Sequence, residues 1–166
     1  MRTIDHIVIH CSATREDRSL TVAELEENHR CRGFRGIGYH YYIRKDGTVI
    51  NTRALELVGA HAKGHNAHSI GICYEGGLDA KGRAKDTRTP EQRAALRLLV
   101  HQLLRRFHGE VRVCGHRDLS PDRNGDGVVE PEVTGVVTAA PATGVAEAAE
   151  AAASGVRRAA AGLSMV

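Results

Sequence analysis

Two apolar, β-prone segments of this chain each end on a histidine. Residues 7–10 read Ile-Val-Ile-His, and residues 111–116 read Val-Arg-Val-Cys-Gly-His. Apolar residues on both faces of the first segment predict a central strand that is covered on both sides. A histidine at the end of each of two strands indicates two ligands of one metal ion. We therefore take His10 and His116 as a candidate metal pair.

Zinc is the metal that this pair favours, because it accepts histidine nitrogen and keeps an open position when three protein ligands hold it. His6 shares the face of His10, but four residues along a strand place it about 13 Å away, too far to bind the same ion. The third ligand stays open among Cys11, Cys114, Asp118 and Asp122. A single histidine has a structural role more often than a ligand role. The metal hypothesis therefore depends on the fact that His10 and His116 both end a predicted strand.

Composition limits the class of protein. The chain has 166 residues, a length that suits one domain, and its 42% hydrophobic content supplies a core. A net charge of +3 is too small for a nucleic-acid-binding protein but suits an anionic polymer. The sequence has no membrane-spanning run and no signal-peptide pattern, so we expect synthesis in the cytoplasm and no membrane partner. The four cysteines lack a Cys-x-x-Cys pair, so we expect thiols and no disulfides.

Local signals predict the order of the elements. We expect a strand at 3–10, a helix at 22–30, strands at 39–43, 48–51 and 69–74, a helix that begins at Pro90, and a strand up to His116. Thr21 with Glu24, and Thr89 with Gln92, have capping-box spacing. Asp46-Gly47 between two β-prone runs predicts a hairpin.

Two stretches between these elements carry chemistry. Residues 39–42 read Tyr-His-Tyr-Tyr, and a tyrosine near a metal stabilises an oxyanion. Residues 53–68 are irregular and contain three histidines, which is typical of a functional loop. Residues 122–127 resemble the start of a calcium loop, but position 12 of that loop is Val133, so we favour an Asx-rich turn.

From residue 133 onward the sequence is almost entirely Ala, Gly, Val, Thr, Glu and Arg. This composition predicts a low-complexity tail with little to pack. We therefore expect one domain at residues 1–131 and a tail at 132–166.

Five ordered motifs closely resemble the type-2 N-acetylmuramoyl-L-alanine amidases, the family of the phage-type lysozyme amidases and the animal peptidoglycan recognition proteins. The motifs lie at 7–14, 36–49, 59–77, 89–96 and 115–131. The resemblance implies an α/β (α+β) fold with a mixed central sheet flanked by helices. It also implies zinc-dependent hydrolysis of the amide between N-acetylmuramic acid and L-alanine in peptidoglycan.

The resemblance also assigns roles to individual residues. His10 and His116 match the family's zinc histidines, and Tyr39 matches its active-site tyrosine. The segment that lines the family's substrate groove matches residues 61–68. We expect the substrate-binding residues to be His40, His61, Lys63, Asn66 and His68.

The chain departs from the family after Pro131. The family's third zinc ligand is a cysteine in a Cys-Pro-x-Phe segment, whereas residues 132–144 read EVTGVVTAAPATG. Members without that cysteine are typically proteins that bind peptidoglycan without cutting it. Peptidoglycan binding without hydrolysis is therefore the alternative to the amidase function. The abrupt change in composition predicts an out-of-frame or replaced C-terminal segment.

The resemblance leaves two further expectations. Some phage-type relatives also bind RNA polymerase, and this contact is a third function that rests on family analogy alone. A protein made in the cytoplasm acts on the cell wall only if it is released.

Overall fold

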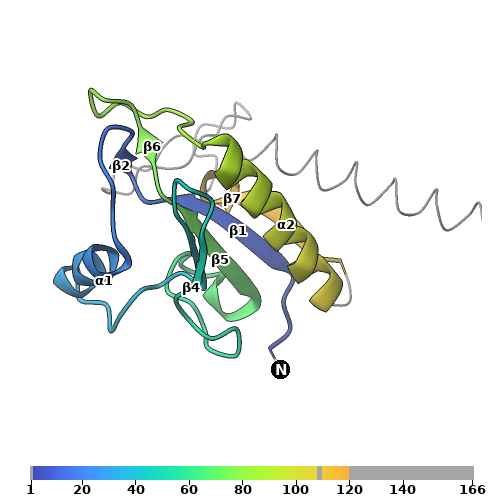
Figure 1. Cartoon of the computed structure of the whole chain (residues 1–166). Helices are drawn as coiled ribbons and strands as arrows, with labels where there is room; N and C mark the ends of the chain where they lie inside the picture. The colour runs from blue at the N-terminus through green and yellow to red at the C-terminus, as the bar shows by residue number, and fades with distance from the viewer. Residues whose placement is uncertain (1, 108–109, 120–166) are drawn as a thin grey trace, which may run out of the picture.

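The computed structural model describes residues 2–107 and 110–119 (Figure 1). The expected domain boundary after residue 131, the tail at 132–166 and the turn at 122–127 lie outside these residues. None of the helices in the described part is long and apolar enough to cross a membrane.

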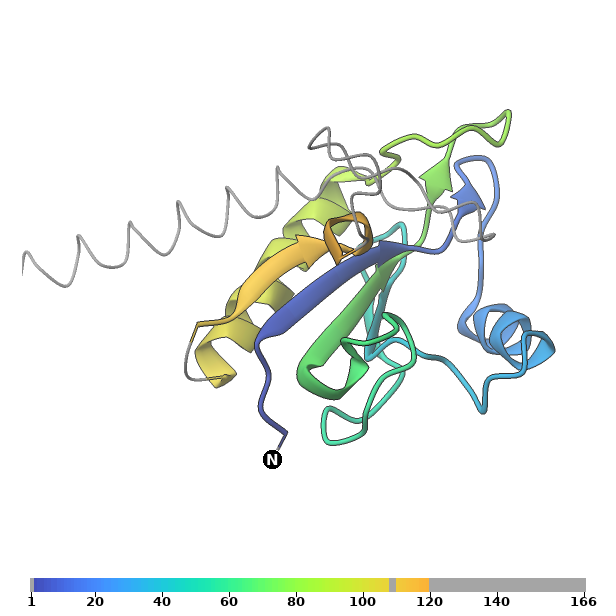
Figure 2. The same ribbon diagram turned by 180° about the vertical axis from the view of Figure 1, so that it is seen from behind.

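A five-stranded mixed sheet forms the centre of the fold, in the order β4-β3-β5-β1-β7. Its strands are β1 (His6–Cys11), β3 (Tyr41–Ile43), β4 (Val49–Asn51), β5 (Ser69–Tyr74) and β7 (Arg112–Gly115). Strand β1 lies between β5 and β7 and runs parallel to both (Figure 2), whereas β4 is antiparallel to β3. A small second sheet pairs β2 (Thr14–Arg15) with β6 (Gly77–Leu78). The predicted mixed central sheet is confirmed.

Both helices begin where the capping boxes predict. Helix α1 (Val22–Cys31) starts after Thr21, and α2 (Pro90–Arg106) starts after Thr89, each with the reciprocal cap hydrogen bonds in place. Short 3₁₀ turns, η1 (Asn66–His68) and η2 (His116–Leu119), lie before β5 and after β7. The hairpin prediction is also confirmed, with Gly47 at φ +84° in the turn, where glycine avoids the strain of a side chain.

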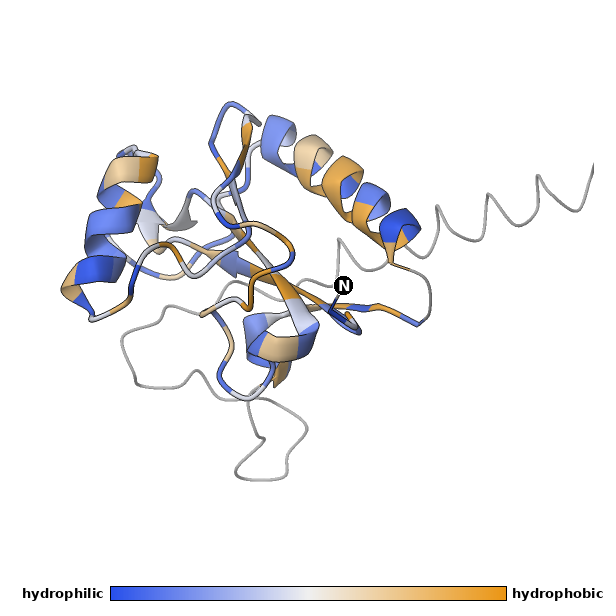
Figure 3. Ribbon diagram, turned by 90° about the horizontal axis from the view of Figure 1, so that it is seen from below, coloured by the Kyte–Doolittle hydropathy of each residue, from blue (hydrophilic) through white to orange (hydrophobic). Residues whose placement is uncertain are grey.

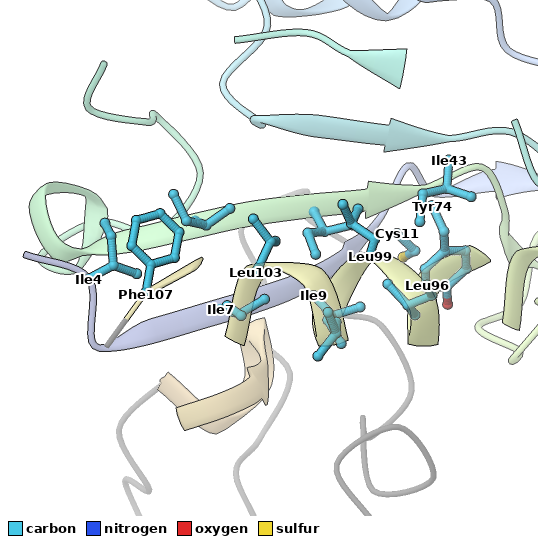
Figure 4. Packing of buried hydrophobic residues seen from close by; sticks show 13 residues of the cluster. Ile4, Ile7, Ile9, Cys11, Ile43, Tyr74, Leu96, Leu99, Leu103 and Phe107 are labelled. Atoms are coloured by element: carbon cyan, nitrogen blue, oxygen red, sulfur yellow. The ribbon is translucent and has the colours of Figure 1, made fainter. Parts of the chain in front are cut away.

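Helix α2 covers one face of the sheet. Its apolar stripe, visible in Figure 3, packs on alternate residues of β1 and β5 (Figure 4). The cluster comprises Ile4, Ile7, Ile9, Cys11, Ile43, Ile70, Ile72, Tyr74, Leu96, Leu99, Val100, Leu103 and Phe107. Alternation from β1 would place Ile4 on the other face. Ile4 nevertheless joins this cluster, because it precedes the strand and strand alternation does not govern it.

The opposite face of the sheet is shared between a smaller core and polar side chains. Leu25 of α1 packs there with Ile37, Tyr39, Tyr42 and Cys73. The described cysteines form no disulfide, as expected. His10 lies on this second face, at the end of β1.

Candidate metal centre and substrate groove

His10 and His116 meet at the carboxyl ends of two parallel strands. Ile9 pairs with Gly115 across β1 and β7, so the residues that follow them lie side by side. The two Nδ1 atoms are 3.2 Å apart. Two nitrogen ligands of a tetrahedral zinc, each about 2.0–2.1 Å from the ion, are about 3.3 Å apart. The observed separation therefore fits two ligands of one zinc ion.

A third ligand is not found among the described residues. No third His, Cys, Asp or Glu there completes this pair as a trio with ligand atoms within 4.8 Å of one another. Cys11 packs on the α2 side of the sheet, and the Asp118 carboxylate accepts a hydrogen bond from the Gly115 N–H at 2.7 Å. Asp122 lies outside the described residues.

The other ring nitrogen of His10 contacts His61. His10 Nε2 is 3.0 Å from His61 Nδ1, and His61 Nε2 is 3.4 Å from the Ser69 hydroxyl. Burial, then the neighbouring His61 and His116, lower the pKa of His10 well below its ordinary value. A neutral His10 that donates from Nε2 to His61 keeps the Nδ1 lone pair directed at His116, which is the form a metal requires.

Glycines make room for the His61 ring. A Cβ atom at Gly71 or at Gly59 would lie 2.5 Å from His61 Cδ2. The loop backbone around His61 is fixed by the Asn66 side chain, which accepts hydrogen bonds from the N–H groups of His61 and Ala62 at 2.8 Å. These contacts set the position of the ring behind His10.

Tyr39 lies beside the metal pair. Its ring centroid is 5.0 Å from that of His10 and 5.3 Å from that of His29. Burial, followed by the Cys73 and Cys11 thiols, raises the pKa of Tyr39 well above its ordinary value. The phenol therefore stays protonated and able to donate a hydrogen bond.

A pocket of about 310 Å³ opens above these residues. Its lining consists of His29, Arg32, Phe34, Tyr39, Ala60, His61, Ala62, Lys63 and His116. Two exposed cations, Arg32 and Lys63, stand at the pocket and favour a ligand with carboxylates. Sequence reasoning missed His29, Arg32 and Phe34. The spacing of His29 in the helix at 22–30 fits a packing role, and the glycine-rich turn after the helix carries no chemical signal.

The predicted substrate-binding residues divide between the pocket and other places. His61 and Lys63 line the pocket, whereas Asn66 and His68 are absent from its lining. The assignment of His40 is corrected: its side chain has no exposed surface and cannot touch a substrate. The His40 ring accepts a hydrogen bond from the Gly71 N–H at Nδ1 and donates from Nε2 to the Leu57 carbonyl.

The buried His40 leads to a prediction about acid stability. Burial is the main reason that the pKa of His40 falls to about 4, and Arg2 and Arg53 lower it further. In the unfolded chain His40 takes up a proton near pH 6.5, and in the folded chain it does so only near pH 4. The free energy of unfolding therefore decreases as the pH is lowered from about 6.5 to about 4. This residue alone accounts for a loss of up to ~3 kcal/mol in the free energy of unfolding.

Urea unfolding at about pH 7 and about pH 4.5 checks this expectation. His40→Asn, which keeps an acceptor for Gly71, should lose less stability on acidification than the unmodified chain. His101→Asn, at a half-exposed position on α2, is the matched control. An equal acid loss in all three proteins would show that His40 does not carry the effect.

With the fold and site in view, the chain falls in the class of mixed α/β proteins with a histidine pair beneath a groove. The family model of N-acetylmuramoyl-L-alanine amidase matches residues 1–127. The chain therefore belongs to this family of amide hydrolases.

Individual relatives agree with this assignment. The endolysin of Enterobacteria phage T3 is 41% identical over 119 residues, which cover 72% of this chain and 78% of the relative. The solved structure of the amidase LysC from Clostridium intestinale URNW matches with a TM-score of 0.60 and 34% identity, covering 71% of this chain and 73% of LysC. Drosophila PGRP-LB has the same fold, with a TM-score of 0.59 at 21% identity over 72% of each chain.

Proposed function

We propose that this chain hydrolyses the amide between N-acetylmuramic acid and the L-alanine of the peptidoglycan stem peptide, with Zn²⁺ held by His10 and His116. The observation that carries the proposal is the 3.2 Å separation of the two Nδ1 atoms beneath the groove. A bound zinc would lower the pKa of a water molecule toward about 7 and polarise the amide carbonyl.

The residues of the chain have separate tasks in this reaction. His61 orients His10 through the 3.0 Å contact between their rings. Tyr39, protonated and 5.0 Å from His10 between ring centroids, donates a hydrogen bond to the oxyanion that forms on the amide carbonyl. Arg32 and Lys63 bind carboxylates of the stem peptide at the rim of the pocket.

A second candidate function is peptidoglycan binding without hydrolysis. One observation favours it: no cysteine follows Pro131 in the sequence, where the family places its third zinc ligand. Two histidines hold zinc more weakly than three ligands do, so the enzyme should need zinc in excess. The pocket described above could bind peptidoglycan in either function.

Incubation of the full chain with purified peptidoglycan separates the two. Hydrolysis adds water across the amide, leaving a carboxyl group on the lactyl side and a free amine on L-alanine. Mass spectrometry should detect released stem peptides in excess zinc and none after chelation. If the protein stays bound to peptidoglycan at saturating zinc and no stem peptides are released, the binding function is supported. If a chelator does not change the amount of stem peptide released, the proposed role of zinc in hydrolysis is contradicted.

A further inference from the structure

A second group of metal-ligating side chains lies at the other end of β1. His6 Nδ1 and His68 Nδ1 are each 2.5 Å from the same oxygen, Asp5 Oδ1. Their side chains are partly exposed, at 19% for His6, 35% for His68 and 49% for Asp5. Among the described residues, this is the group of three whose ligand atoms all lie within 4.8 Å of one another.

A third imidazole stands beside this group. The ring centroid of His65 is 5.8 Å from that of His6 and 5.5 Å from that of His68. The Nδ1 atom of His65 is buried and has no hydrogen-bond partner. Two imidazoles are directed at one carboxylate oxygen, and a further imidazole nitrogen without a hydrogen-bond partner lies nearby. The group therefore offers more potential metal ligands than a simple surface ion pair does.

The backbone holds the group together independently of the groove. The Asp5 N–H donates to the His68 carbonyl at 3.0 Å, and His6 pairs with Ser69 across β1 and β5. His6 precedes His10 by four residues of one strand, which is about 13 Å. The group is therefore distinct from the His10 and His116 pair.

We propose that Asp5, His6 and His68 bind a divalent transition-metal ion such as Zn²⁺, with His65 or water in the fourth position. Two imidazole nitrogens and one carboxylate oxygen suit zinc, whereas calcium and magnesium prefer oxygen ligands alone. Ligand atoms around a tetrahedral zinc are about 3.3 Å apart, so each imidazole has to move by less than about 1 Å. Partly exposed side chains at a strand end have the freedom for this movement.

The ion would act as a structural clamp. It would join the start of β1, at Asp5 and His6, to the η1 turn that leads into β5, at His68. A metal that binds only the folded chain raises its free energy of unfolding, and this gain grows with the logarithm of the metal concentration once that exceeds the dissociation constant. Burial is the largest single influence on the Asp5 carboxyl and opposes its ionisation, but the hydrogen bonds from His6 and His68 together outweigh it and lower its pKa, so the group carries the negative charge that a cation ligand needs.

The test uses the full chain with His10→Ala and His116→Ala, so that the groove pair cannot bind zinc. Zinc titration of this double variant should show about one bound equivalent and a zinc-dependent rise in melting temperature. Adding His68→Ala should weaken that binding by at least about 10- to 100-fold and remove the rise. Adding His101→Ala instead, on α2, should change neither.

Two results would overturn the proposal. One is a double variant that binds no zinc, and the other is zinc binding that survives both His68→Ala and Asp5→Asn. Circular dichroism confirms that each variant is folded, and His68→Asn replaces His68→Ala if the alanine variant is not. Because the groove histidines are absent throughout, failure here leaves the amidase proposal standing.

Discussion

His116→Ala is expected to remove zinc from the groove and to reduce hydrolysis of peptidoglycan to the level of the chelated enzyme. His116 supplies one of the two nitrogens that lie 3.2 Å apart, and one histidine alone cannot hold the ion. Zinc affinity at this site should fall by at least about 100-fold. The fold should survive, because His116 is only half-buried and begins a short turn at the end of β7.

Matched variants make this expectation specific. His101→Ala also removes a half-buried histidine but lies on α2, on the other side of the sheet, and should retain full activity. Circular dichroism and a thermal melt establish that both variants are folded. Hydrolysis by His116→Ala at the rate of the unmodified chain would show that the metal assignment is wrong.

Tyr39→Phe is expected to lower turnover by about 10²-fold or more while leaving the affinity for muropeptides nearly unchanged. The change removes only the phenolic hydroxyl and keeps the ring that packs against His10 and His29. A hydrogen bond to the oxyanion exists in the transition state and not in the bound substrate, so its loss appears in turnover. Single-turnover kinetics with a soluble muropeptide measure this loss, and calorimetry measures the affinity.

Tyr41→Phe is the control for that experiment. Tyr41 is the next tyrosine along the chain, but it packs against the α2 side of the sheet. Its substitution should change neither quantity. If turnover and affinity fall in parallel in Tyr39→Phe, Tyr39 is a binding residue and its role in the oxyanion step is refuted.

The parts of the fold that local signals determine could be predicted from the sequence. The bounds of β5, the starts of both helices and the turn at Gly47 depend on neighbouring residues, and all were found where expected. The meeting of His10 and His116 was also predictable, because strand ends and a family pattern both point to it.

Long-range packing determined what the sequence did not show. His40 was expected at the groove, but β3 begins only at Tyr41, and the His40 ring instead satisfies backbone groups of Gly71 and Leu57. The contact of His61 with His10 depends on two glycines that approach its ring from separate segments. The Asp5 and His68 contact joins residues that only the β1 and β5 register brings together.

Anomalous X-ray diffraction at the zinc edge, from crystals of the full chain grown with zinc, tests the central claim most directly. We expect an anomalous peak about 2.0–2.1 Å from both His10 Nδ1 and His116 Nδ1, at the base of the groove beside Tyr39. A zinc-saturated crystal without a peak between these two histidines, even with one at Asp5, His6 and His68, would contradict the account.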